Sequence, residues 1–319
     1  MAVYMVRRFI QAIFVLMLTT VVIFLLMRLL PGDPVLLYVS QDEYERTTSQ
    51  PEIDALRAEF GLDKPLAVQY FVWLGGVFRG DLGKSIFWGT TVRDEIARAL
   101  PVSLWLGSSA WLISHLVGPL MGLVCAIRRS KWQDTLLTTL ANIGITAPIF
   151  WVGILMIYAF GLHLSWFPIQ GYVSPLDDFG DSVYHLIIPV FVLSVTHLAG
   201  GTRQMRSSML EVVRQDYIRT AWAKGLRERT VVFRHALKPG VLPVVTLSGM
   251  SIPALFGGSV LIETVFNIPG MGLLSVNALF SQDYAIVQGV NLMIASIVVM
   301  ANFIVDISYG WLDPRVRYQ

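Results

Sequence analysis

Long apolar segments separated by polar stretches dominate the chain. A helix needs about 20 mainly apolar residues to cross a bilayer, and these segments come close to or exceed that length. The six predicted spans are Phe9–Leu30, Ser103–Ile127, Thr135–Leu162, Leu186–Gly200 with a continuation to about Met209, Leu242–Ile262 and Ala285–Trp311. The pattern therefore predicts an all-α membrane protein with six transmembrane helices.

Composition supports this class. Of the 319 residues, 55% are hydrophobic and 14% are charged, and the mean hydropathy is +0.61. Soluble domains carry roughly 25% charged residues. The net charge of +2 is too small to indicate a nucleic-acid partner. The single cysteine, Cys125, excludes an internal disulfide or a Cys-x-x-Cys metal pair, and its place inside an apolar span indicates a buried packing residue.

Basic residues orient the spans, because cytoplasmic loops carry an excess of Lys and Arg. Arg7 and Arg8 precede the first span, which is too long for a signal peptide and lacks an obvious cleavage site. Basic residues also follow spans two, four and six, whereas the loops after spans three and five contain none. The residues after spans two and six are Arg128, Arg129, Lys131, Arg315 and Arg317. Both termini are therefore predicted to be cytoplasmic.

The interval from Pro31 to about Leu100 differs in kind, with eleven Asp and Glu residues against seven Lys and Arg. Short amphipathic helices are predicted at Glu52–Phe60 and Val68–Phe78. We interpret the interval as a small extracytoplasmic domain between the first two spans. The predicted organisation is an N-terminal tail with the first span (1–30), this domain (31–100), a five-helix transmembrane core (101–311) whose long cytoplasmic loop covers about 207–241, and a cytoplasmic tail (312–319).

A basic block runs from Arg203 to Pro243 and holds nine of the chain's 24 Lys and Arg residues. Inside it, apolar residues recur at helical spacing until Gly225, which is typical of a helix C-terminus. A second short helix is predicted from Arg227 to Lys238, with Pro239 ending it. The apolar residues at helical spacing are Val213, Tyr217, Ala221 and Trp222. Two short helices held at the cytoplasmic face indicate a docking platform for another protein.

Proline and glycine interrupt several of the spans. They are common in membrane helices, where they serve ordinary close packing. The alternative is a bundle whose helices bend around a translocation path. The residues concerned are Pro119, Pro148, Pro189, Pro253, Gly257 and Gly258. The sequence leaves both interpretations open.

Candidate chemistry is sparse. The stretch Gly80-Asp81-Leu82-Gly83-Lys84-Ser85 is similar to a phosphate-binding P-loop, but that motif needs a glycine where Phe78 stands. We reject the match and expect a turn. No metal-ligand spacing links the five histidines, and no catalytic motif is present, so the sequence predicts neither a metal site nor an enzyme.

A few ionisable residues lie within or near spans. His115 and His197 are candidates for a proton relay or a ligand site, but an internally hydrogen-bonded packing histidine is the simpler alternative. Arg28, Glu263 and Asp306 lie near span ends, where snorkelling or interfacial pairing is a sufficient explanation.

The basic block closely resembles the cytoplasmic loop of ABC-importer permeases. The resemblance rests on Asp216-Tyr217-Ile218-Arg219-Thr220-Ala221-Trp222-Ala223-Lys224-Gly225-Leu226, then Arg234-His235-Ala236-Leu237-Lys238 and Leu242-Pro243-Val244-Val245-Thr246. Further segments agree in order: Pro31-Gly32-Asp33-Pro34, Gly61-Leu62-Asp63-Lys64-Pro65, Gly80-Asp81-Leu82-Gly83, Glu263-Thr264-Val265-Phe266, Pro269-Gly270-Met271-Gly272, Asp283-Tyr284 and Asp313-Pro314-Arg315. The ordered set covers nearly the whole chain and is most similar to the B-type permease subunit of the dipeptide, oligopeptide and nickel branch.

This resemblance implies the type I ABC importer permease fold in a bacterial inner membrane. It also implies a second homologous permease, one or two cytoplasmic ATPase subunits that bind ATP and Mg²⁺, and an extracytoplasmic solute-binding protein. No cofactor is expected on this chain. The residues that the resemblance assigns to ATPase coupling are Asp216, Tyr217, Arg219, Thr220, Ala221, Lys224, Gly225, Leu226, Arg234 and His235.

The wider importer pattern has Glu-Ala-Ala, three residues and then Gly. Here Arg219-Thr220-Ala221 precede Gly225, so the usual acidic contact is replaced by a basic residue.

The resemblance favours import of dipeptides or oligopeptides. Alternatives are the same machinery for nickel chelates or another small solute, a secondary transporter that acts alone, and a membrane scaffold or sensor. A secondary transporter would show an internal repeat with paired broken helices, which the sequence lacks. The residues that line a substrate path are not identifiable from the sequence.

Overall fold

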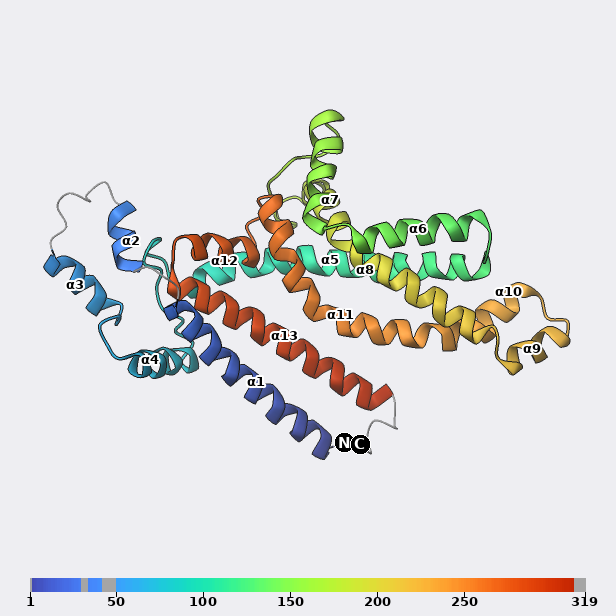
Figure 1. Ribbon diagram of the computed structural model, residues 1–319, viewed down its shortest axis with the longest axis horizontal. Coiled ribbons are helices and arrows are strands. Elements are labelled where there is room, and N and C mark those ends of the chain that lie inside the picture. Colours follow the sequence, from blue (N-terminus) through green and yellow to red (C-terminus); the bar gives the residue numbers. More distant parts are fainter. Residues whose placement is uncertain (1, 30–33, 42–49, 313–319) are drawn as a thin grey trace. The chain divides into compact units, whose positions relative to one another are not determined.

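The computed structural model describes residues 2–29, 34–41 and 50–312 (Figure 1). This part of the chain is helical and contains no strand, apart from an isolated bridge between Lys84 and Thr91. It divides into two compact units, one of residues 1–103 with 269–319 and one of residues 104–268. Two segments of the family resemblance, Pro31-Gly32-Asp33 and Asp313-Pro314-Arg315, lie outside the described residues, as does Arg317.

Four helices in the described part of the chain are long and apolar enough to cross a membrane. They are α1 (Ala2–Leu29), α5 (Val92–Ile127), α8 (Phe179–Val212) and α13 (Tyr284–Leu312). A bent pair of helices raises the number to five if it counts as one span. The predicted span Leu242–Ile262 falls within α11 (Leu237–Val265), a helix of 29 residues.

The bent pair occupies the region predicted as one span at Thr135–Leu162. It consists of α6 (Trp132–Thr146) and α7 (Ile149–Met156), and the π-helical segment η1 (Ile157–His163) continues α7. The chain bends by 108° between α6 and α7. Pro148 explains the break, because proline cannot donate the helical hydrogen bond and disfavours helical backbone in the preceding residue; Ala147 is accordingly extended. The expectation of a continuous helix here is wrong.

Small residues bring α5 close to α8 within the second unit. A Cβ atom on Gly118 would lie 2.7 Å from the carbonyl oxygen of Leu198, so only glycine allows this approach. Two hydroxyl groups on α8 then reach carbonyl oxygens on α5: Thr202 Oγ1 donates to Gly118 O at 3.0 Å, and Ser194 Oγ donates to Ala110 O at 3.1 Å. Each hydroxyl also bonds back to its own helix, so neither is left unsatisfied.

A buried carboxylate joins α6 to α8. Asp134 accepts two hydrogen bonds from Arg206, from Nε at 2.7 Å and from Nη2 at 2.9 Å. It also accepts from the Ser130 backbone N–H at 3.0 Å and from Thr138 Oγ1 at 3.3 Å. A buried charge is tolerated when it is paired and hydrogen-bonded in this way.

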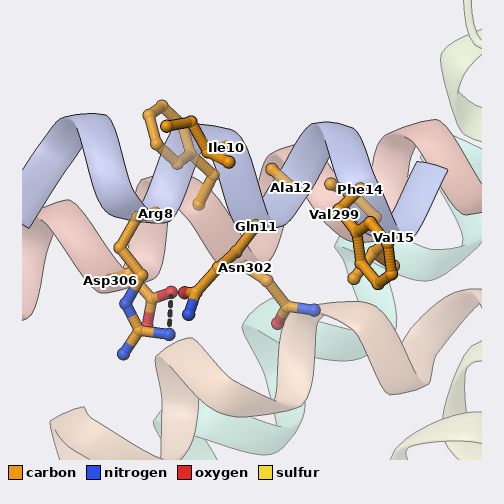
Figure 2. A pocket seen from close by; sticks show the side chains of 10 residues that line it. Arg8, Ile10, Gln11, Ala12, Phe14, Val15, Val299, Asn302 and Asp306 are labelled. Carbon is orange, nitrogen blue, oxygen red and sulfur yellow. Dashed lines mark ion pairs between the residues drawn. The ribbon is translucent and has the colours of Figure 1, made fainter. Parts of the chain in front are cut away.

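In the first unit, α1 lies along α13 (Figure 1). Near the N-terminal end of α1, Arg8 pairs with Asp306 at 3.2 Å, and Gln11 and Asn302 lie close by at the wall of a cavity of about 570 Å³ (Figure 2). Asp306 is thus paired, in line with the second of the two explanations that the sequence allowed.

Short helices precede α5 in the first unit. They are α2 (Pro34–Gln41), α3 (Gln50–Glu59) and α4 (Leu66–Phe78). The sequence predicted α3 and α4 to within two residues at each end. The start of α5 packs with α12 (Met271–Phe280) and α13 in a buried apolar cluster that includes Val92, Ile96, Met271, Ile286 and Val290.

The Gly80–Ser85 stretch forms a turn, as expected. Gly80 and Gly83 have φ angles of 78° and 90°, which only glycine adopts readily. Ser85 Oγ donates to the buried Asp283 at 2.5 Å, and Ile286 N donates to the same carboxylate at 3.2 Å. Burial raises the pKa of Asp283, and these hydrogen bonds lower it in part. The turn is thus fastened to the start of α13.

Candidate coupling site

A short helix projects beyond the end of the α8–α11 pair (Figure 1). This helix, α9 (Asp216–Ala223), follows α8 after a turn of three residues. It ends in a Schellman motif: Gly225 N donates to Trp222 O at 2.9 Å, and Leu226 N approaches Ala221 O at 3.4 Å. Gly225 has a φ angle of 73°, which residues with a side chain rarely adopt. The sequence-based prediction that Gly225 ends the helix is confirmed.

One face of α9 is anchored in the protein. Ile218 and Ala221 are buried, and they join an apolar cluster with Met205 and Met209 of α8 and Val231 of the following segment. Apolar packing therefore anchors this face of α9 against α8 and against the segment that leads into α11.

The opposite face of α9 is exposed. Of the apolar residues noted at helical spacing, Ala221 is buried, but Val213, Tyr217 and Trp222 are exposed, and Tyr217 retains 48% of its accessible surface. Asp216 and Arg219 form an ion pair at 3.2 Å on this face. Aromatic residues and arginine are enriched in protein interfaces, so this face of α9 is a candidate contact surface.

The second predicted helix differs from expectation. The structure has α10 (Glu228–Thr230) and the π-helical segment η2 (Val231–Ala236), which run without interruption into α11. Pro239 lies inside the first turn of α11, so the prediction that it ends a helix is wrong. A π-helical turn contains an extra residue, and this wider turn just before Pro239 accommodates a ring that lacks an N–H.

The structure places the ten predicted coupling residues in one continuous segment. Seven of them are exposed, two are half-buried and one is buried. The exposed ones are Asp216, Tyr217, Arg219, Thr220, Lys224, Gly225 and Arg234, the half-buried ones are Leu226 and His235, and the buried one is Ala221. The site offers contact surface and charge, and no nucleophile–base arrangement is built from these residues.

The two candidate histidines lie near each other, with ring centroids 6.3 Å apart. Both nitrogens of His115 have partners: Nδ1 lies 2.9 Å from Trp111 O, and Nε2 lies 2.9 Å from Ser251 Oγ. His115 is therefore internally hydrogen-bonded, as the simpler of the two interpretations holds. Among the described residues, no group of three or more His, Cys, Asp or Glu side chains is placed to hold a metal ion.

Sequence reasoning missed the pairing of Asp134 with Arg206. The available signal was an acidic residue at the start of a span, because an ionised side chain near a membrane needs a partner. The identity of that partner, 72 residues away, was not readable from the spacing.

Four long apolar helices, and a bent pair that can form a fifth span, define a polytopic membrane protein. Residues 118–318 match the family of binding-protein-dependent transport system inner membrane components, and residues 1–106 match the N-terminal region of such components. The chain belongs to this family, and it is a permease subunit of a multi-pass inner-membrane importer. Family membership excludes the stand-alone secondary transporter and the scaffold.

Curated relatives match over nearly the whole chain. A peptide permease protein of Brucella ovis is 41% identical over 98% of both chains, and the oligopeptide transport system permease protein AppB of Bacillus subtilis is 38% identical over 100% of both. The structure of the MetNI methionine ABC transporter is similar in fold, with a TM-score of 0.52 and 15% identity, and covers 68% of this chain and 96% of that chain. The resemblance noted in the sequence is thus confirmed.

Proposed function

We propose that the permease imports dipeptides or oligopeptides and that α9 transmits the energy of ATP hydrolysis from a partner subunit. The names of the relatives support the peptide cargo. The observation that carries the coupling role is the anchored helix itself, with one face buried in the protein and the other exposed.

The proposed topology has six spans, with both termini in the cytoplasm and residues 31–100 outside. In this topology, the bent α6–α7 pair and α11 are the two spans in addition to the four long apolar helices. The basic residues around α9 support a cytoplasmic position for it, where an ATPase could reach it.

The proposed partners are a second homologous permease, one or two ATPase subunits with ATP and Mg²⁺, and an extracytoplasmic binding protein. The exposed face of α9, with Tyr217 and Arg219 at its centre, would fill a cleft of the ATPase. When the ATPase dimer closes, the movement passes through Ile218 and Ala221 to α8 and α11, because close-packed apolar contacts transmit displacement.

A charge exchange on α9 tests this role. The double variant Asp216→Arg with Arg219→Asp keeps an ion pair within the helix but exchanges the charges shown to the ATPase. In proteoliposomes that contain the complete transporter, we expect peptide uptake to fall by about tenfold or more. The ATP hydrolysis that the binding protein stimulates should no longer drive uptake.

The matched control is Arg129→Glu, a charge change on another predicted cytoplasmic loop, which should leave uptake within about twofold of the wild type. Normal uptake by the exchanged variant would refute the coupling role of α9.

A further inference from the structure

A cavity of about 520 Å³, lined by both polar and apolar residues, lies where α1 ends, within the first unit. Its wall is made by the end of α1, the α3–α4 connection, the Gly80–Ser85 turn and the start of α13. Small-molecule sites have volumes of about 300–1,000 Å³, so the cavity is of ligand size.

Three residues that line this cavity each carry a buried hydrogen-bond donor without a partner among the described residues. The donors are Arg28 Nη1, Trp73 Nε1 and Gln288 Nε2. The Gln288 side chain belongs to a residue that is only 3% exposed. Buried polar groups nearly always have partners, so three unsatisfied donors around one cavity need an explanation. Each of the three atoms requires an acceptor, and one of them belongs to a cation.

The Arg28 guanidinium is held in place rather than free to turn toward water. Its Nε donates to Gln69 Oε1 at 2.9 Å, and Gln69 is itself fixed by a hydrogen bond to Lys64 O at 2.7 Å. The rings of Phe24 and Tyr284 lie 4.9 Å and 4.7 Å from the guanidinium carbon. This arrangement pre-organises a positive charge and leaves Nη1 of the guanidinium without a partner among the described residues.

We propose that this cavity binds the terminal carboxylate of a cargo peptide, with Arg28 as its charged partner and Gln288 and Trp73 as neutral donors. The inference rests on the proposed peptide-import function and its topology, which places the end of α1 on the outer side. A carboxylate supplies the acceptors that these donors lack, and it pairs well with a guanidinium. The donor atoms are covered by neighbouring side chains, so binding is accompanied by a side-chain rearrangement at the cavity wall.

Opposite charges in the same cavity favour a peptide over a simple anion. Glu59 and Asp81 line it together with Lys64 and Lys84. A peptide is a zwitterion, and the two carboxylates offer a partner for its terminal ammonium group. The phosphate of an anionic lipid would also accept hydrogen bonds from the donors, but it would not pair with the acidic residues.

Photolabelling of the assembled transporter in nanodiscs tests the site. The probe is a tripeptide with a central photoreactive leucine, and the competitors are trialanine and trialanine amide. We expect labelling within residues 59–86 or at the start of α13, and trialanine should compete about tenfold to a hundredfold better than its amide, which lacks the carboxylate. Arg28→Gln should remove this discrimination. Arg7→Gln, the same change on the same helix outside the cavity, should preserve it.

Gln288→Leu provides a second variant that does not depend on a difficult replacement of Arg28. Because Gln288 Nε2 has no partner in the described structure, this change should leave the melting temperature without peptide unchanged or raised. It should nevertheless weaken competition by trialanine several-fold. A lower melting temperature with unchanged competition would overturn the assignment of Gln288 to the ligand.

Two further outcomes would overturn the proposal. Equal competition by trialanine and its amide would show that no carboxylate is recognised. Displacement of the probe by phosphatidylglycerol, with no effect of trialanine, would assign the cavity to a lipid phosphate. Failure of the wild-type assembly to import any peptide would refute the proposed function, whereas normal import with equal competition refutes this site alone.

Discussion

Replacement of Gly118 by alanine tests the packing of α5 against α8. The new Cβ would lie 2.7 Å from Leu198 O, 3.2 Å from Leu198 Cα and 3.3 Å from Leu198 C. Carbon atoms in ordinary contact lie about 3.5–4.0 Å apart, so the two helices must separate by several tenths of an ångström or more. All three opposing atoms belong to the backbone, and a rotamer change cannot relieve the overlap.

The expected magnitude follows from two opposing terms. Overpacking costs about 1–3 kcal/mol, while alanine gains up to about 1 kcal/mol over glycine in a helix. The separation also lengthens the Thr202–Gly118 hydrogen bond, although Thr202 keeps its second acceptor, Leu198 O. We expect Gly118→Ala to lower the free energy of unfolding by about 1–2 kcal/mol.

Gly200→Ala is the matched control, because a Cβ there meets nothing within 4 Å. This variant should raise the free energy of unfolding by about 0.5–1 kcal/mol. Titration of the purified protein with SDS in mixed micelles gives both values. If Gly118→Ala proves as stable as Gly200→Ala, the close approach of α5 and α8 is not what stabilises the second unit.

Two buried carboxyl groups, those of Asp134 and Asp283, yield further predictions that the same SDS titration can measure. Asp134→Asn should lower the free energy of unfolding by about 3 kcal/mol, because it leaves Arg206 without its anion. Adding Arg206→Met should recover part of the loss. If the effects of the two substitutions on the free energy of unfolding simply add, the pairing is contradicted. Burial raises the pKa of Asp283 above the value of about 3.9 in an unfolded chain, so the folded state keeps a proton that the unfolded state has lost. Stability should therefore fall as pH rises from about 4 through the folded pKa and level off above it, and Asp283→Asn should abolish this slope; a slope of the opposite sign would refute the assignment.

Apolar periodicity was sufficient to predict much of the architecture. Long apolar runs such as the one within α13 have the length that a transmembrane helix needs, and few other structures require so many consecutive apolar residues. The end of α9 was also predictable, because a glycine after a short amphipathic stretch has few other roles than to adopt positive φ.

Proline was the less reliable signal, because its effect depends on the surrounding turn. Pro148 breaks a span and bends the pair by 108°, whereas Pro239 lies in a continuous helix after a π-helical segment. The π-helical turn before Pro239 makes the difference, and the sequence did not predict that turn. The angle of a break depends on packing with other helices, which a single sequence does not reveal.

Long-range polar contacts were also beyond the sequence. Ser85 and Asp283 are 198 residues apart, and only the fold brings them together. The cavity around Arg28 has the same character, because its donors come from α1, α4 and α13. Pattern arguments identify which residues face a core, but not which polar groups lack a partner there.

The most direct test of the central claim is a cross-link from α9 to the ATPase. The natural Cys125 is 0% exposed, so a cysteine introduced on the surface is the reactive thiol in the described part of the chain. The test variant is Tyr217→Cys, and Leu176→Cys, at a position 95% exposed in the loop after the third predicted span, is the control.

With a maleimide–succinimidyl ester reagent, which joins a thiol to a lysine, the complete transporter should give an adduct between Tyr217→Cys and an ATPase subunit. Leu176→Cys should give none. The absence of an adduct from Tyr217→Cys, or an equal yield from both positions, would contradict the claim that α9 is the helix through which the ATPase drives transport.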